Sequence, residues 1–272
     1  MKLARVLVAL ARGLWHVMVG WWTIQLHFPR LSPQQREARV QVWAAQLLAL
    51  WGIRLEVRGT PPLAGPVLLV ANHLSWLDIL VLHAARHCRF VSKADVRRWP
   101  LVGFMASGAG TLYIERERRR DAMRMVRVMT AALTDGDVLA VFPEGTTGDG
   151  SRLLPFHANL IQAAIAAQAP VQPVALRFAD RATGAVATGP SYVGDETLLG
   201  SVWRTLSGPP IDAIVVFGEA QTADGRDRRA WARELRTAVG VLCEAAATGP
   251  VRAGPSAPAD AGRRASGTSG DC

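Results

Sequence analysis

Apolar residues dominate the start of the chain and predict a long helix over residues 6–28. Two polar side chains, Arg12 and His16, interrupt this run. A helix that crosses a bilayer would avoid a charge at that depth, so the pattern favours a helix that lies in the membrane interface or dips into a single leaflet. A signal sequence and an ordinary buried helix are the alternatives, although no convincing cleavage site follows the apolar run.

A second helix follows the first after a short break. Ser32, Pro33 and Gln35 match a helix start, with Ser32 as the N-cap, a proline in the first turn and a glutamine that closes the capping box. Gly52 ends this helix. The two helices form a candidate hairpin, residues 1–51, which we expect to associate with a membrane.

From residue 53 onward the pattern changes to short runs rich in β-branched residues, which alternate with longer helical runs. The short runs predict strands at 53–58, 66–71, 89–92, 111–114, 138–142, 171–178 and 213–217. The longer runs predict helices at 75–87, 119–134, 156–168 and 227–247. Strands that alternate with helices indicate an α/β fold, in which a mixed, largely parallel sheet is flanked by helices. We expect this domain to span residues 52–248.

Charge and tryptophan content together indicate the kind of partner. The 272 residues carry a net charge of +9, which indicates an anionic partner such as nucleic acid, anionic lipid or a phosphorylated substrate. Five of the nine Trp residues fall in the first 51 positions: Trp15, Trp21, Trp22, Trp43 and Trp51. Tryptophan prefers the boundary between lipid and water. We therefore expect a membrane surface with anionic lipid, and no nucleic acid, as the partner.

Cysteine spacing and the end of the chain add two further expectations. Cys88, Cys243 and Cys272 have neither metal-ligand spacing nor a CxxC pattern, which suits a reducing compartment without a disulfide framework. Residues 249–272 consist mainly of Gly, Ala, Pro, Ser and Arg. Such a composition cannot bury a core, so this segment is predicted to be disordered.

The first motif with candidate chemistry, NHLSWLD (72–78), follows a strand that reads as buried and opens a helix. A turn followed by a helix can fold Asp78 back onto the imidazole of His73. A carboxylate that accepts a hydrogen bond from one ring nitrogen fixes the tautomer and leaves the other nitrogen as a base. Such a pair can take a proton from a hydroxyl group that attacks a carbonyl. The spacing alone is a weak signal, and a helix-capping His with a surface Asp is the alternative.

Three further motifs also involve predicted strands. GTLYIER (110–116) ends on Arg116, whose guanidinium suits bidentate binding of an anion. FPEGTT (142–147) is a turn rich in glycine and hydroxyl groups, and its backbone N–H groups can surround a polar ligand. The third segment, VQPV (171–174), contains Pro173 and follows Pro170. Proline cannot donate a hydrogen bond to a neighbouring strand, so we expect this strand to lie at an edge of the sheet or to contain a bulge. The positions of the motifs predict a crevice at one edge of the sheet.

In this order, NHLSWLD, GTLYIER, FPEGTT and VQPVAL resemble the motifs of the glycerolipid acyltransferases, specifically the 1-acylglycerol-3-phosphate acyltransferase type. The resemblance covers about residues 66–180, and the upstream helices resemble the membrane hairpin of that family. It implies an O-acyltransferase that moves a fatty acyl group from acyl-CoA or acyl carrier protein to the free hydroxyl of a lysolipid. It also implies a location on the cytoplasmic face of a membrane and 1-acylglycerol-3-phosphate as the acceptor.

The same resemblance implies roles for individual residues. It makes His73 the general base and Asp78 its orienting partner. The residues that would hold the acceptor are Lys93, Arg116, Glu144, Gly145 and Thr146. Acyl transfer from a thioester needs a base, an oxyanion stabiliser, an anion site and an apolar groove, so neither a metal nor a cofactor is expected.

Two departures from the family pattern leave the acceptor open. Thr147 stands where the family often has a basic residue, and His157 lies in the segment where a relative would often place a lysine. This version resembles acyltransferases that act on lyso-ornithine lipid, so a lyso-aminolipid is the alternative acceptor. The alternative outside the enzymes is a basic protein that only binds a membrane, and the presence of both His73 and Asp78 argues against it.

Overall fold

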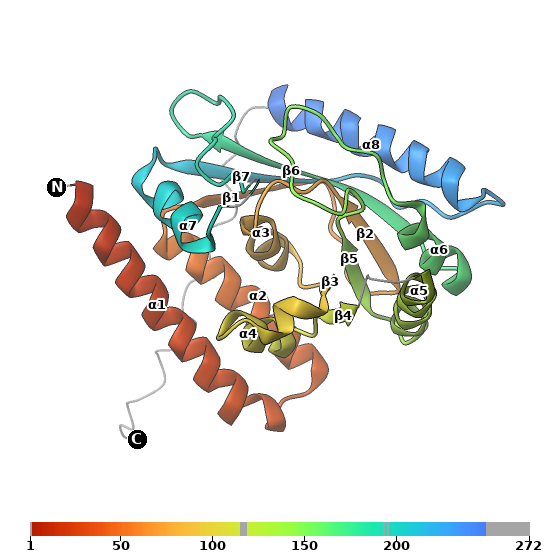
Figure 1. The fold of residues 1–272 in the computed structure, drawn as a ribbon, viewed down its shortest axis with the longest axis horizontal. Helices are drawn as coiled ribbons and strands as arrows, with labels where there is room; N and C mark the ends of the chain where they lie inside the picture. Colours follow the sequence, from red (N-terminus) through yellow and green to blue (C-terminus); the bar gives the residue numbers. More distant parts are fainter. Residues whose placement is uncertain (1, 115–118, 193, 195, 249–272) are drawn as a thin grey trace, which may run out of the picture.

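A seven-stranded sheet lies at the centre of the computed structural model, which describes residues 2–114, 119–192, 194 and 196–248 (Figure 1). The strand order is β1-β7-β6-β2-β5-β3-β4. The strands are β1 (Arg54–Arg58), β2 (Val67–Ala71), β3 (Arg89–Lys93), β4 (Leu112–Ile114), β5 (Val138–Val141), β6 (Val171–Asp180) and β7 (Ile211–Phe217). Strands β6 and β7 are antiparallel, whereas the other neighbouring strands are parallel. The mixed, largely parallel sheet expected from the sequence is therefore confirmed.

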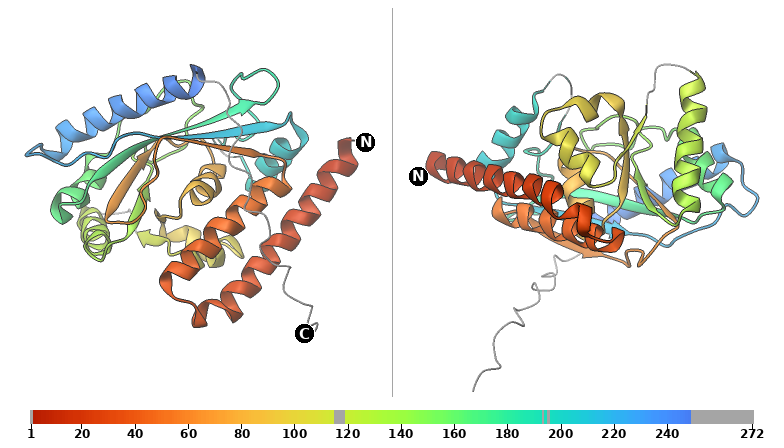
Figure 2. Two further views of the ribbon diagram at one scale, coloured as in Figure 1. Left: turned by 180° about the vertical axis from the view of Figure 1, so that it is seen from behind. Right: turned by 90° about the horizontal axis from the view of Figure 1, so that it is seen from below.

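Helices cover both faces of this sheet. They are α1 (Lys2–Leu26), α2 (Pro33–Leu50), α3 (Leu77–Ala85), α4 (Val102–Gly108), α5 (Arg119–Thr134), α6 (Ala158–Ala167), α7 (Leu198–Ser207) and α8 (Arg228–Thr248), with the short 3-10 helices η1 (Phe28–Arg30) and η2 (Ala94–Arg98). Helices α2 and α3 pack against one face, and α5, α6 and α8 pack against the other (Figure 2). The predicted tail, residues 249–272, lies outside the described residues.

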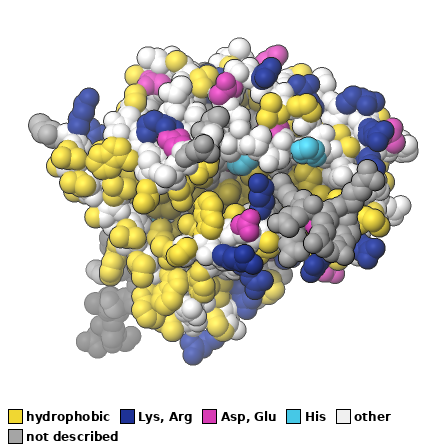
Figure 3. Space-filling view, viewed as in Figure 1, with side chains coloured by type: hydrophobic (Ala, Val, Ile, Leu, Met, Phe, Trp, Pro, Cys, Tyr) yellow, Lys and Arg dark blue, Asp and Glu magenta, His cyan; other side chains and the backbone are white. Residues whose placement is uncertain are grey.

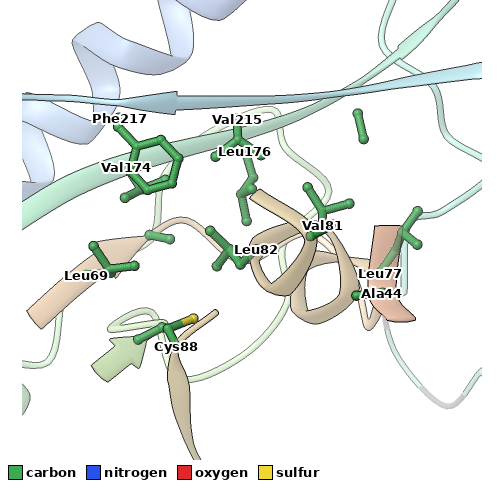
Figure 4. Packing of buried hydrophobic residues seen from close by; sticks show 14 of the residues in the cluster. Ala44, Leu69, Leu77, Val81, Leu82, Cys88, Val174, Leu176, Val215 and Phe217 are labelled. Carbon is green, nitrogen blue, oxygen red and sulfur yellow. The ribbon is translucent and has the colours of Figure 1, made fainter. Parts of the chain in front are cut away.

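The core between α3 and the sheet holds the strands in place (Figure 4). Leu69 of β2, Val174 of β6, Val215 of β7 and Leu82 of α3 are all fully buried there. Burial of such a side chain stabilises the fold by roughly 1.5–3 kcal/mol. Strands β2 and β7 are buried along their whole length because helices cover both faces, which explains the continuous apolar sequence of β2. In β7 the run is interrupted only by Asp212, whose buried carboxylate pairs with Arg54 and Arg181. The sheet is thus a rigid platform for the loops at its edge.

The N-terminal hairpin consists of α1 and α2, which lie side by side in Figure 1 and Figure 2. The capping box at the start of α2 is confirmed, because Ser32 Oγ accepts from Gln35 N and Gln35 Oε1 accepts from Ser32 N. Helix α1 has 25 residues and is long and apolar enough to cross a membrane by length and composition alone. Whether it crosses or lies in one leaflet stays a prediction.

Two glycines allow α1 to approach α2 closely. A Cβ atom at Gly13 would lie 2.5 Å from Trp51 Nε1, and one at Gly20 would lie 2.5 Å from Trp43 Nε1. Between them, His16 Nε2 lies 3.0 Å from the carbonyl oxygen of Trp43, whose Nε1 donates to the carbonyl oxygen of His16. His16, which interrupts the apolar run in the sequence, is therefore used to bind the two helices together.

The expectation that VQPV lies at an edge of the sheet is wrong, whereas the alternative of a bulge agrees with the pairing. These residues begin β6, which lies inside the sheet between β7 and β2. Val171 pairs with Gln221 and Val174 pairs with Phe217, so the segment that follows β7 has one extra residue opposite VQPV.

Proline at position 173 has no backbone N–H to donate to a neighbouring strand. It is tolerated because β7 ends at Phe217, which pairs with Val174, so Pro173 lies just beyond the end of β7. The carbonyl oxygen of Pro173 still accepts a hydrogen bond from Gly218 N at 2.9 Å.

Helices α4 and α7 were not expected from the sequence. Helix α4 is only seven residues long. Helix α7 inverts the usual pattern, because its polar residues Ser201 and Thr205 are buried while Leu199 is 80% exposed and Trp203 is 42% exposed. Ser201 Oγ accepts a hydrogen bond from Trp76 Nε1 at 3.0 Å. The buried stripe of α7 is thus polar and satisfied by hydrogen bonds, which hydrophobic periodicity does not detect.

Candidate active site

The candidate site residues lie at the carboxyl ends of neighbouring parallel strands. His73 follows β2, Glu144 follows β5, and Lys93 is the last residue of β3. The carboxyl ends of parallel strands meet at one edge of a sheet, where loops with functional residues gather. The structure therefore brings the first and third motifs together at the predicted edge.

Asp78 folds back onto His73 from the first turn of α3. Its Oδ2 accepts a hydrogen bond from His73 Nδ1 at 2.7 Å. The same oxygen accepts from the backbone N–H of Leu74 at 2.6 Å and of Ser75 at 2.8 Å. The Asp78 side chain is fully buried, so the carboxylate is fixed from three directions. The contact that the spacing predicted is present in the structure.

The imidazole of His73 is held in one plane and keeps one nitrogen available. Its ring stacks on Phe142, with 3.9 Å between the ring centroids and an angle of 6° between the planes. Phe142 in turn stacks on Phe90. The Nε2 atom makes no hydrogen bond to any described residue, and the His73 side chain is 19% exposed. With Nδ1–H directed at Asp78, Nε2 carries the free lone pair of a neutral imidazole.

Glu144 is buried beneath the same loop. Its Oε1 accepts from His73 N at 2.9 Å, and its Oε2 accepts from Leu154 N at 2.8 Å. Burial raises the pKa of Glu144 above its ordinary value, while the two backbone N–H groups act in the opposite direction. Both carboxylate oxygens thus accept hydrogen bonds from backbone N–H groups.

Asn72 is a site residue whose role the sequence did not reveal. Its Oδ1 accepts from Leu176 N at 2.7 Å, and its Nδ2 donates to the carbonyl oxygen of Leu176 at 3.0 Å. This reciprocal pair joins the end of β2 to β6 immediately before His73. The signal available in the sequence was an asparagine directly after a buried strand, because a buried amide needs hydrogen-bond partners.

The third motif forms a tight turn beside His73. Gly145 has φ +76°, and a Cβ atom at that position would lie 3.0 Å from the ring of His157. Thr146 is exposed, whereas Thr147 Oγ1 donates to the carbonyl oxygen of Tyr192. Thr147, one of the two departures from the family pattern, therefore connects the turn to the segment before α7.

Lys93, the candidate cation among the described residues, lies on the β3 and β4 side of the site. Lys93 is exposed and pairs in register with Ile114. Arg116 comes two residues after Ile114 and lies outside the described residues. Arg97 of η2 stacks over Tyr113, with its Cζ 6.0 Å from the ring centroid. The structure therefore places Lys93 next to the strand end that precedes Arg116.

A cavity of about 560 Å³ adjoins the candidate site on the side of α8. His73 and Glu144 line it, together with apolar residues that include Leu153, Leu176 and Phe178. In the part of the chain that the structure describes, no group of three or more His, Cys, Asp or Glu side chains could hold a metal ion. Arg152, Arg177 and Arg236 also line the cavity, so its wall is apolar in one part and cationic in another. The apolar part, next to an imidazole, suits an acyl chain or another apolar group.

The known proteins that are similar to this chain are acyltransferases. The family model described as Acyltransferase matches residues 54–177. The chain is 36% identical over 234 residues to a lyso-ornithine lipid O-acyltransferase of Pseudomonas aeruginosa, covering 86% of this chain and 88% of that protein. It is 39% identical over 200 residues to a 1-acyl-sn-glycerol-3-phosphate acyltransferase of Neisseria meningitidis, covering 73% of this chain and 78% of that protein.

A solved structure has the same fold. The crystal structure of a 1-acyl-sn-glycerophosphate acyltransferase from Thermotoga maritima superposes with a TM-score of 0.62 at 18% identity. The superposition covers 89% of this chain and 98% of that protein.

Proposed function

The chain belongs to the glycerolipid acyltransferase family and is an O-acyltransferase, and on that premise we propose that it acylates the free hydroxyl of a lysolipid with His73 as the general base. The observation that carries this proposal is the contact between His73 Nδ1 and the buried Asp78. That contact orients the ring and leaves Nε2 ready to accept a proton.

The proposed reaction proceeds through one tetrahedral intermediate. His73 Nε2 takes the proton from the acceptor hydroxyl as its oxygen attacks the thioester carbonyl. The C–S bond then breaks, an ester bond remains, and the departing thiolate receives the proton from the imidazolium. Asp78 stabilises the imidazolium during this step because its carboxylate accepts from Nδ1. The donor in this proposal is acyl-CoA or acyl carrier protein, since both present a fatty acyl thioester.

The acceptor head group is proposed to lie on the β3–β4 side of the site. Lys93 and Arg116 would supply positive charge, and Gly145 and Thr146 would line the turn. A phosphomonoester carries a charge near −2 at pH 7 and is best held by several cations, which supports 1-acylglycerol-3-phosphate as the first acceptor to test. The first relative described above, which aligns with 86% of this chain, is named for a different acceptor.

That second acceptor, lyso-ornithine lipid, is favoured by a specific observation. Thr147 and His157 stand where further cations would be expected for a phosphate, and the Thr147 hydroxyl is engaged with the carbonyl oxygen of Tyr192. The turn therefore offers an anionic head group fewer partners. Loss of one charge-assisted hydrogen bond costs on the order of 1.5–3 kcal/mol, which is enough to change the preferred acceptor.

Membrane association is supported by the exposed face of the hairpin. Helix α1 exposes a set of large apolar side chains, namely Leu3, Leu7, Leu14, Trp15 and Trp22. Figure 3 shows that hydrophobic side chains gather over α1 and α4 on the same face that displays histidines near its centre. Lys2 and Arg5, at the start of α1, would meet anionic head groups. A site that opens on this face could receive its acceptor directly from the lipid surface.

We place the protein on the cytoplasmic face of a membrane in this proposal, with α1 in a single leaflet. Acyl thioesters of coenzyme A and acyl carrier protein are cytosolic, so the site must face that side. Labelling residues 2 and 32 from one side of sealed vesicles tests the arrangement of α1. Reaction of both positions from the same side is expected, and reaction from opposite sides would mean that α1 crosses the bilayer.

The proposed function is tested by offering each acceptor separately to the purified protein in mixed micelles. Thiol release from an acyl-CoA and the mass of the lipid product would both be measured, with acyl carrier protein as the second donor. Release that depends on a lysolipid is expected, with the higher kcat/KM for 1-acylglycerol-3-phosphate. Release with lyso-ornithine lipid alone would reverse the acceptor assignment, and no lysolipid-dependent release with either donor would refute the proposal.

A further inference from the structure

Glu144 supports the loop that carries His73 through a buried hydrogen-bond network. The residue is only 6% exposed, and its Oε1 accepts from the backbone N–H of His73 at 2.9 Å. The carbonyl oxygen of His73 accepts from Gly148 N at 2.8 Å. The peptide groups on both sides of the His73 Cα atom are therefore held by the turn that contains Glu144.

The other carboxylate oxygen of Glu144 connects this loop to a second segment. Oε2 accepts from Leu154 N at 2.8 Å. That segment is held in turn by Arg236 of α8, whose Nε donates to the carbonyl oxygen of Leu154 at 3.0 Å and whose Nη2 donates to that of Leu153 at 2.6 Å. A continuous series of hydrogen bonds thus runs from α8 through Glu144 to His73.

The chemistry of a carboxylate suits this position better than that of any neutral side chain. Both partners of Glu144 are N–H donors, and an ionised carboxylate accepts with both oxygens. A glutamine in the same place could accept with one oxygen only, and its NH₂ group would face the second donor. Loss of either bond would leave a buried N–H unpaired and free the loop to move.

We propose that Glu144 positions the catalytic base instead of contacting the acceptor, and that Arg236 is the outer anchor of the same network. This inference rests on the proposed role of His73 and deepens it. It differs from the role that the family resemblance implies for Glu144, which is to hold the acceptor. Arg236 lies outside residues 54–177, the part of the chain that the family model matches.

The two roles predict opposite kinetic signatures. A residue that binds the acceptor in the ground state changes KM, whereas a residue that positions the base changes kcat. Small displacements of a catalytic group can cost about 10²-fold in rate. We expect Glu144→Gln to lower kcat about 10- to 100-fold and to leave the acceptor KM within about twofold. Arg236→Ala should lower kcat in the same direction by a smaller factor.

The test is a double-mutant cycle between Glu144→Gln and Arg236→Ala, with kcat and the acceptor KM measured for each variant. Arg233→Ala is the matched control, because Arg233 is exposed on the same helix and its side chain makes no hydrogen bond to a described residue. Coupled residues are not additive, so the double variant should lose less than the product of the two single losses.

Several results would overturn this inference. A rise of tenfold or more in acceptor KM for Glu144→Gln with unchanged kcat would make Glu144 an acceptor ligand. Multiplicative losses, or an Arg236→Ala variant indistinguishable from Arg233→Ala, would remove Arg236 from the network. If Glu144→Gln does not fold, Arg236→Ala and its conservative partner Arg236→Lys still decide the question. Failure of the proposed function would instead appear as absence of lysolipid-dependent transfer in the wild-type protein.

Discussion

The Oδ2 atom of Asp78 is shared by His73 Nδ1 and two backbone N–H groups, whereas its buried Oδ1 has no hydrogen-bond partner among the described residues. The carboxylate therefore does two things at once, because it shapes the turn that begins α3 and orients the imidazole. A substitution at Asp78 can be chosen to separate these two contributions.

Asp78→Asn should reduce activity more than it reduces stability. An asparagine can keep its oxygen toward the three donors, but it no longer carries the charge that stabilises the imidazolium. Its NH₂ group would occupy the buried Oδ1 position without an acceptor, at a cost of about 1–3 kcal/mol. We expect kcat/KM to fall about 10²- to 10⁴-fold while the protein still unfolds cooperatively. A fold change below ten in kcat/KM would contradict the orienting role.

The turn after β5 should tolerate a Cβ atom poorly at Gly145. The positive φ of this residue disfavours a side chain, and the added Cβ would contact the His157 ring. Gly136→Ala is the matched control, since Gly136 has φ +90° but no heavy atom within 4 Å of the added Cβ. Thermal unfolding of both variants should show a larger loss for Gly145→Ala, which His157→Ala partly restores. Equal losses in the two glycine variants would mean that the contact with His157 is unimportant.

Membrane binding should depend on α1 and not on apolar exposure in general. Trp15 is 72% exposed on α1, whereas Leu63 is 95% exposed in the loop between β1 and β2. Insertion of an apolar face into the interface drives binding of an amphipathic helix, so a charge on that face opposes it. Sedimentation with anionic vesicles should show weaker binding for Trp15→Asp, by about tenfold, and wild-type binding for Leu63→Asp. Equal effects of the two substitutions would refute the assignment of this face.

Two buried histidines should make the fold sensitive to acid. Burial, and next the neighbouring His87, lower the pKa of His83 to about 3. Burial lowers the pKa of His87 to about 4, although its hydrogen bond to the carbonyl oxygen of Ala109 acts in the opposite direction. Both side chains therefore stay neutral in the folded protein while the unfolded chain takes up protons below about pH 6.5. Stability is full above pH 6.5 and declines as the pH falls from 6.5 toward 4.

The size of this effect can be measured by denaturant unfolding between pH 4.5 and 7. At pH 5 each buried histidine would lower the free energy of unfolding by up to about 2 kcal/mol. His83→Leu should reduce the pH dependence, because it removes one group that binds a proton only in the unfolded chain. His27→Leu, at an exposed position, is the control and should leave the slope unchanged. The same slope in all three proteins would contradict this account.

Much of the fold was predictable because its signals are local. The capping box of α2, the buried run of β2 and the helical run at 119–134 each arise from neighbouring residues, and all three elements are present. Helix α7 could not be predicted in this way, because its buried stripe is polar and finds its partners on other segments. The central position of β6 was also hidden, since it depends on where β7 ends.

In the candidate site, too, some contacts follow from local sequence and others depend on distant segments. The contact between His73 and Asp78 follows from five positions of local spacing, and the sequence predicted it. The role of Asn72 and the hydrogen bond from His73 N to Glu144 depend on segments that are far apart in the chain. Arg236 lies 82 residues from Leu154, so nothing in the motif sequence could reveal their hydrogen bond. The order of motifs indicates the chemistry, whereas the packing decides which residues support it.

The most direct measurement of the central claim is acyl transfer by the His73→Ala variant beside His27→Ala as the control. Thiol release and lipid product would be followed with the preferred lysolipid, and circular dichroism and thermal unfolding would establish that both variants are folded. Loss of a general base typically lowers the rate by about 10²–10⁴, so His73→Ala should lose transfer to that extent while His27→Ala keeps it. Wild-type turnover by a folded His73→Ala protein would contradict the account.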